Sequence, residues 1–117
     1  MEKVIKIKEN REFKRAYSRG KSFVCPFVVV YAFKNRSATT RLGITAGKKI
    51  GKAVERNRAK RVITAAYRQC LPQIVSGYDF VIVARARILT AKSTAVAASL
   101  LKLFKAAGFC KESKVNE

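Results

Sequence analysis

Histidine is absent from this chain of 117 residues, and only seven residues are acidic. The missing imidazole removes the usual general base and the commonest metal ligand. The acids are also scattered, since three lie in the first twelve residues and two in the last six. A two-metal nuclease site built by protein needs several carboxylates that converge on metals about 4 Å apart. We therefore predict neither catalytic residues nor a metal site in this chain.

Cysteine and long apolar runs are scarce as well. The three cysteines, Cys25, Cys70 and Cys110, form no C-x-x-C pair, which favours packed, reduced thiols over a disulfide framework or a zinc site. The longest apolar run, residues 23–33, contains Pro26 and is too short to span a bilayer. The first residues lack the apolar core of a signal peptide. We expect a cytoplasmic protein with no membrane partner.

Positive charge is abundant, with 26 lysines and arginines and a net charge of +19. A hydrophobic content of 49% indicates a folded domain rather than a disordered basic tail. The length suits one domain over residues 1–117, with residues 1–8 and 111–117 expected to be flexible. A partner of such a domain should be strongly anionic, and nucleic acid is the commonest polyanion.

Hydrophobic periodicity predicts an α+β fold, a two-layer α/β sandwich in the order helix, three strands, helix, strand, helix. Asn10 is expected to cap the first helix, and Pro72 to stop the central one. The third strand, the central helix and the last strand can form a βαβ crossover, which the general rule makes right-handed. The predicted helices cover residues 10–18, 52–71 and 92–107, and the strands residues 22–24, 27–34, 41–46 and 78–85.

The central helix has two different sides. Its apolar side recurs every three or four residues, so it should pack on the sheet. Between residues 48 and 68, eight lysines and arginines face a single acid, Glu55, and like charges at helical spacing repel one another. A bound polyanion explains this better than a solvated basic face. The apolar side comprises Ala59, Val62, Ile63, Ala66, Tyr67 and Cys70.

Residues 41–61 read RLGITAGKKIGKAVERNRAKR. This segment resembles the signature of the bacterial ribonuclease P protein family, in which a strand, a K-K-x-G-x-A-V loop and an R-N-R-x-K-R helix follow one another. A first helix with two aromatics, a Val/Tyr strand and a late strand ending in Ala84 and Arg85 also match. The resemblance implies a left-handed crossover, against the general rule, in a fold shared with the second domain of a small-subunit ribosomal protein.

The resemblance also implies a function. In this family the enzyme is an endoribonuclease that removes the 5′ leader of precursor tRNA, and its RNA subunit carries the chemistry. The implied cofactor is Mg²⁺, held mainly by the RNA subunit and the substrate. The implied partners are the catalytic RNA and precursor tRNA, with no obligate protein partner. Two alternatives remain: a small structural ribosomal RNA-binding protein, and a nuclease that acts without RNA, for which the side chains are missing.

Two sets of site residues follow from the resemblance. Arginine suits the first because its planar donor fork bridges phosphate oxygens. Arg58 follows Arg56 by two residues, which is about 200° around the helix, and can serve the fold or the cleft instead. Many family members carry a basic residue where this chain has Thr64, and Arg68, one turn further on, can compensate. The set predicted to bind the RNA subunit is Arg56, Asn57, Arg58, Lys60, Arg61 and Arg68.

The second set forms a cleft beside the sheet, resembling the leader-binding groove of the family. Aromatic rings stack on unpaired bases with little sequence preference, which suits leaders of varied sequence. For Phe27, Phe33, Phe80 and Phe104 a place in the core is the better interpretation. The predicted leader-binding set is Phe13, Tyr17, Val29, Tyr31, Lys48, Lys49 and Lys52.

Overall fold

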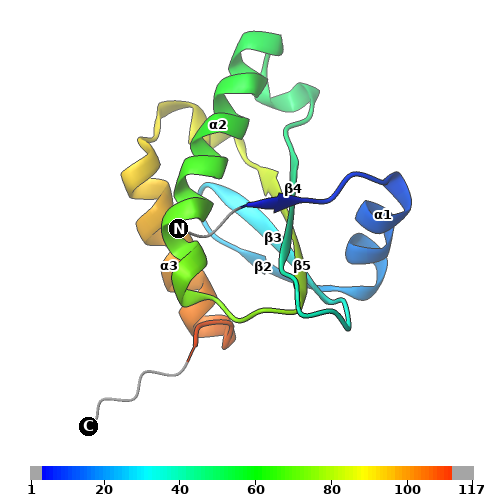
Figure 1. Ribbon diagram of the computed structural model, residues 1–117. Helices are drawn as coiled ribbons and strands as arrows, with labels where there is room; N and C mark the ends of the chain where they lie inside the picture. Colours follow the sequence, from blue (N-terminus) through cyan, green and yellow to red (C-terminus); the bar gives the residue numbers. More distant parts are fainter. Residues whose placement is uncertain (1–3, 112–117) are drawn as a thin grey trace, which may run out of the picture.

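The structure, a computed structural model, describes residues 4–111 and consists of one mixed sheet with three helices (Figure 1). The strands are β1 (Ile5–Lys6), β2 (Lys21–Val24), β3 (Val28–Lys34), β4 (Arg41–Thr45) and β5 (Tyr78–Ala84). The helices are α1 (Asn10–Arg19), α2 (Ala53–Cys70) and α3 (Ser93–Ala107), with single 3₁₀ turns η1 (Lys48–Ile50), η2 (Leu71–Gln73) and η3 (Ala86–Thr90). The predicted α+β order is confirmed, with β1 added in front.

The sheet has the strand order β1-β4-β5-β3-β2. β4 and β5 pair in parallel, with Thr45 opposite Val83, although α2 separates them in the chain. The predicted βαβ crossover is therefore confirmed, and the left hand that the family resemblance implies for it stays a prediction. β3 pairs antiparallel with both β5 and β2, so β2 forms one edge of the sheet.

The two faces of the sheet are covered differently. In Figure 1, α2 and α3 lie side by side on one face, and α1 lies on the other. Side chains alternate along β3 accordingly. Val28, Val30 and Ala32 are buried in the main core beneath α2 and α3. Tyr31 and Phe33 are only half-buried and pack with the smaller cluster beneath α1.

The amino-terminal segment differs from the flexible lead-in that the sequence predicted for residues 1–8. Ile5 and Lys6 pair with the start of β4, and the Ile7 backbone N–H donates to the Leu42 carbonyl at 2.9 Å. Ile7 is buried against Ala16 beneath α1, and this apolar burial explains why the segment joins the sheet. Residues 1–3 and 112–117 lie outside the described residues, as does most of the predicted flexible tail.

The predicted cap of the first helix is also wrong. Glu9 occupies the N-cap position of α1, and no side chain caps the helix there. Asn10 is instead the first helical residue. The Glu9 carboxylate forms an exposed ion pair with Arg11 at 2.7 Å, so its charge lies beside the helix N-terminus, where the helix dipole favours an anion.

The main core contains Phe80 and Phe104, both fully buried as predicted, with ring centroids 5.0 Å apart. Phe27 is half-buried at the margin of this core. The three cysteines are free thiols, which confirms that they form no disulfide framework. Burial raises the pKa of Cys70 to about 11, as expected for a packed, inert thiol. Within residues 4–111, no helix combines the length and apolar character needed to cross a bilayer.

Candidate nucleic-acid interface

Glu55, the single acid of the basic segment, caps the N-terminus of α2. Glu55 accepts a hydrogen bond at 2.9 Å from the backbone N–H of Lys52, which would otherwise lack a partner at the helix N-terminus. Gly51 has a φ of +146°, and a Cβ at this position would overlap the Glu55 carboxylate. Glycine is therefore required just before the helix, and Glu55 does not neutralise the cations further along α2.

The exposed side of α2 carries most of the predicted RNA-subunit set. Arg56 is half-buried, and no cation of this set has an ion pair within the described part of the chain. Thr64 is uncharged, and its hydroxyl donates to the Lys60 carbonyl of the same helix at 2.8 Å. The face is therefore positive and unneutralised. Its exposed members are Asn57, Lys60, Arg61 and Arg68.

Arg58 points elsewhere, as its angular position on the helix suggested. Its guanidinium donates to the backbone carbonyls of Leu89 at 3.0 Å and of Ala91 at 3.4 Å. These bonds tie α2 to the η3 turn that follows β5. Of the two roles left open for this residue, the structure favours the one in the fold.

Arg58→Ala should lower the free energy of unfolding by about 1–3 kcal/mol, because two carbonyls lose a charged hydrogen-bond donor. Urea unfolding of the purified protein would measure this. The matched control is Arg61→Ala on the exposed side of α2, which should change stability by no more than about 0.5 kcal/mol. Equal stability of the two variants would mean that Arg58 does not support the fold.

The opposite face of the sheet forms a cleft beside α1. The rings of Tyr17 and Tyr31 meet edge to face, with centroids 4.9 Å apart, and the hydroxyls of Tyr17 and Thr45 are hydrogen-bonded at 2.9 Å. Phe13 packs so closely on β4 that a Cβ at Gly43 would lie 2.6 Å from its ring. Phe13 is thus half core and half surface, whereas Tyr17 is exposed.

Further residues line this cleft that the sequence prediction did not include. A hollow of about 340 Å³ beside α1 contains Lys14 and Thr45 next to the predicted Phe13 and Tyr17. On the edge strand β2, Val24 pairs in register with Val29 and shares its face, with 64% of its surface exposed. Alternation along β2 could have identified Val24, but the register with β3 was needed to place it.

A buried ion network holds α1 above this cleft. The fully buried Asp79 accepts two hydrogen bonds from the guanidinium of Arg41, at 2.9 and 2.7 Å, and one from the Asn35 amide at 2.8 Å. On α1, Glu12 pairs with Arg41 at 2.8 Å, and Arg15 lies 3.7 Å from Asp79. The hydrogen bond to Asp79 raises the pKa of Arg41 above its ordinary value, so the arginine remains charged.

The predicted lysines of the basic loop connect the two faces. Lys48 and Lys49 lie in η1 and Lys52 at the N-cap of α2, and all three are exposed. They lie between Thr45, the last residue of β4 and part of the cleft lining, and the basic side of α2. The structure therefore brings the two predicted sets together at this turn.

The described acids offer no metal site. Glu9 and Glu12 pair with arginines, Glu55 accepts from the Lys52 backbone, and Asp79 is enclosed by Arg41 and Asn35. Between residues 4 and 111, no three His, Cys, Asp or Glu side chains gather as a metal site requires. The side chains that the structure describes thus do not fit a protein-held Mg²⁺ ion.

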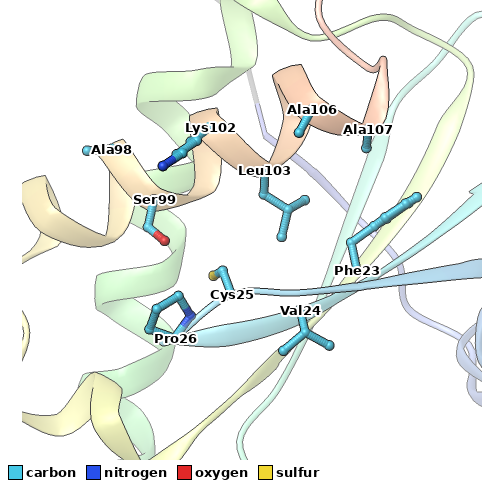
Figure 2. A pocket seen from close by; sticks show the side chains of 10 residues that line it. All are labelled: Phe23, Val24, Cys25, Pro26, Ala98, Ser99, Lys102, Leu103, Ala106 and Ala107. Carbon is cyan, nitrogen blue, oxygen red and sulfur yellow. The ribbon is translucent and has the colours of Figure 1, made fainter.

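An apolar groove of about 720 Å³ lies elsewhere, between β2 and α3 (Figure 2). Figure 2 shows Phe23 and Leu103 directed towards the groove and Val24 directed away from α3, which agrees with its place on the cleft face. Among the lining residues that the structure describes, Lys102 is the one with a charge. With one cation and none of the predicted site residues among its described lining, the groove does not resemble a nucleic-acid site.

Comparison with known proteins decides the family. The sequence model for the family described as Ribonuclease P matches residues 1–108. The chain belongs to the ribonuclease P protein family. It is 41% identical to the ribonuclease P protein component of a Thermoanaerobacter species over 86% of this chain and 87% of the relative. A Clostridium botulinum relative of the same name is 41% identical over 88% of this chain and 94% of its own length.

Solved structures of ribonuclease P proteins have the same fold. The protein from Staphylococcus aureus matches with a TM-score of 0.80 and 32% identity, over 93% of this chain and 100% of that one. The protein from Thermotoga maritima matches with a TM-score of 0.78 and 30% identity, over 86% and 96% of the two chains. Family membership makes this chain part of a ribonucleoprotein endoribonuclease of tRNA processing, with an RNA partner, and decides against a structural ribosomal protein.

Proposed function

We propose that the chain binds the catalytic RNA of ribonuclease P through the basic side of α2 and the 5′ leader of precursor tRNA through the cleft beside α1. One observation supports this most: a surface of unneutralised cations and a surface with an aromatic floor meet at the Lys48–Lys52 turn. Structured RNA presents phosphates to the first surface, whereas a single strand can present bases to the second.

The side of α2 suits a folded RNA. Arg56, Lys60 and Arg61 project from a rigid helix whose far side is core, so binding costs little further ordering of the backbone. Their guanidinium and ammonium groups can each contact phosphate, and Asn57 can hydrogen-bond a base or ribose. We place Arg58 outside this contact because the carbonyls of η3 already occupy it.

The cleft suits an unpaired strand. Tyr17 and Tyr31 offer ring faces and edges for stacking, and Val24 and Val29 extend the apolar floor towards the edge of the sheet. Lys14 supplies positive charge beside the hollow. Stacking has little sequence preference, so such a cleft accepts leaders of varied sequence.

The cleavage chemistry belongs to the RNA subunit in this proposal. The chain has no histidine, and each acid that the structure describes is already engaged by an arginine, an amide or a backbone N–H. Mg²⁺ is then held mainly by the RNA subunit and the substrate. The protein contributes affinity and positioning, and in a bacterial cell it would act in the cytoplasm.

Tyr31→Ala tests the leader site. Removing a base-stacking ring costs about 1–3 kcal/mol, so the affinity of the reconstituted holoenzyme for precursor tRNA should fall roughly 5- to 150-fold. Affinity for mature tRNA, which has no leader, should stay unchanged. Tyr31→Phe keeps the ring and is the matched control. Equal loss for precursor and mature tRNA would contradict the leader assignment.

A further inference from the structure

A second basic hollow lies at the end of the sheet where α1 ends and β2 begins. Its volume is about 450 Å³, and neither set of predicted residues contributes to it. It lies mainly on the α3 side of the sheet, because Lys21 and Lys34 share the face of Ala32. Three cations and four aromatic rings line it: Arg19, Lys21, Lys34, Phe23, Phe33, Tyr78 and Phe109.

The three cations have no acidic partner in the described range. Arg19, Lys21 and Lys34 are all exposed, and none takes part in an ion pair between residues 4 and 111. The described residues that line the hollow include no acid either. Three like charges around one small hollow repel one another, and a phosphate between them would relieve that repulsion.

The aromatic wall gives the hollow a second property. Tyr78 is half-buried, stacks on Phe80 with centroids 5.7 Å apart, and meets the edge of Phe109 at 5.0 Å. These contacts fix its ring in place beside the cations. Fixed aromatic rings beside positive charge are what a nucleotide of a single strand requires, since the base stacks and the phosphate pairs.

Phe33 connects this hollow with the cleft. It lines the hollow, yet it also belongs to the cluster beneath α1, on the same side of β3 as Tyr31. The guanidinium of Arg15 lies over its ring, 4.8 Å from the centroid. Tyr31 and Lys34 are three residues apart, about 10 Å along a strand.

The register of the sheet sets the direction of this path. Thr45, near the lysine turn, pairs in register with Val83 of β5. Val83 in turn pairs with Val29, near the start of β3, so these three residues mark one end of the cleft. Lys34 and Tyr78 pair at the other end of β3. A strand that enters at the lysine turn and crosses the cleft therefore reaches the hollow last, past the junction of α1 and β2.

We propose that this hollow binds a nucleotide of the 5′ leader that lies farther from the cleavage point than the nucleotides in the cleft. The inference rests on the proposed leader-binding function. It adds a distal contact at which the phosphate meets Lys21 and Lys34 and the base meets the wall of Tyr78. Leader length, rather than leader sequence, should then govern how tightly the holoenzyme holds its substrate.

The double variant Lys21→Ala/Lys34→Ala tests this with precursor tRNAs that differ only in leader length, roughly 3 or 12 nucleotides, bound to the reconstituted holoenzyme. Affinity for the long-leader precursor should fall roughly 3- to 10-fold, while affinity for the short-leader precursor and for mature tRNA stays unchanged. For the long leader, the slope of log affinity against log salt should fall by about 1.4, at about 0.7 for each phosphate of a single strand that the two lysines bind.

The matched control is Lys92→Ala/Lys102→Ala, which removes the same charge from exposed positions at and near α3. Equal losses for both double variants, or equal losses for short and long leaders, would overturn the inference, because general electrostatics or the RNA subunit would then explain them. No loss with either leader would also overturn it. The proposed function is judged separately, since only Tyr31→Ala probes the cleft itself.

Discussion

The double variant Arg56→Ala/Arg61→Ala should bind the catalytic RNA roughly 10²- to 10⁴-fold more weakly than the native chain. Each arginine is expected to donate charged hydrogen bonds to phosphate, worth about 1.5–3 kcal/mol, and the RNA would keep its phosphates without these partners. The slope of log affinity against log salt should fall by about 1.8, because each duplex phosphate that an arginine neutralises accounts for about 0.9. Filter binding or fluorescence titration across a salt series measures both quantities.

The control for this experiment removes two charges from another surface. Lys102→Ala/Lys105→Ala lowers the net charge by the same amount, but both lysines lie on α3, away from the basic side of α2. This variant should bind the RNA within a few-fold of the native chain. An unchanged salt slope for the Arg56/Arg61 variant would show that these arginines do not touch phosphate.

Asp79→Ala should lower the free energy of unfolding by about 3–5 kcal/mol. Asp79 is fully buried, and its removal takes two hydrogen bonds from the largely buried Arg41, which keeps its ion pair with Glu12. Removing one partner of a buried ion pair is costly for this reason. Because the network joins α1 to β4 and β5, the same variant should also weaken binding of precursor tRNA.

Two further variants serve as controls for Asp79→Ala. Asp79→Asn keeps the shape and one acceptor oxygen, so it should unfold at a urea concentration between the native chain and the alanine variant. Glu9→Ala breaks the exposed ion pair with Arg11 and should cost no more than about 0.5 kcal/mol. A loss from Asp79→Ala as small as that from Glu9→Ala would mean that the network does not hold α1.

Much of this architecture could be predicted from the sequence because local patterns specify it. The β-branched and aromatic run in residues 27–34 corresponds to β3, and the alternation in residues 41–46 corresponds to β4. The apolar residues spaced by three and four from Ala59 to Cys70 are buried as expected, except that Val62 is half-buried. The basic side of α2 follows from the same spacing. The signature in residues 41–61 identified the family, which the comparisons confirm.

What the sequence did not predict depends on contacts between distant segments. Ile5 and Lys6 form a strand because they pair with the edge of β4 and because Ile7 is buried beneath α1. The sequence around Asp79 does not indicate that this acid is buried. Its partner Arg41 lies 38 residues away in the chain, and only the fold brings the two together. Arg58 reads as one more cation of the basic segment, yet the carbonyls of Leu89 and Ala91 bind it.

The cleft was predicted in part for the same reason. Tyr17 and Tyr31 were paired through the family resemblance, and their rings are in contact. The sequence did not predict that Val24 and Thr45 line the cleft, because strand register places Val24 there and the position of α1 places Thr45 there. The basic hollow at the other end of β3 combines residues from α1, β2, β3, β5 and the end of α3, so no local pattern could reveal it.

The most direct test of the central claim is a cleavage assay of precursor tRNA in Mg²⁺ with three preparations: this protein alone, a bacterial ribonuclease P RNA alone, and the two together at low salt. We predict no cleavage by the protein alone and faster leader removal by the mixture than by the RNA alone. Cleavage by the protein alone, or no stimulation of the RNA, would contradict the account of a protein that assists an RNA catalyst.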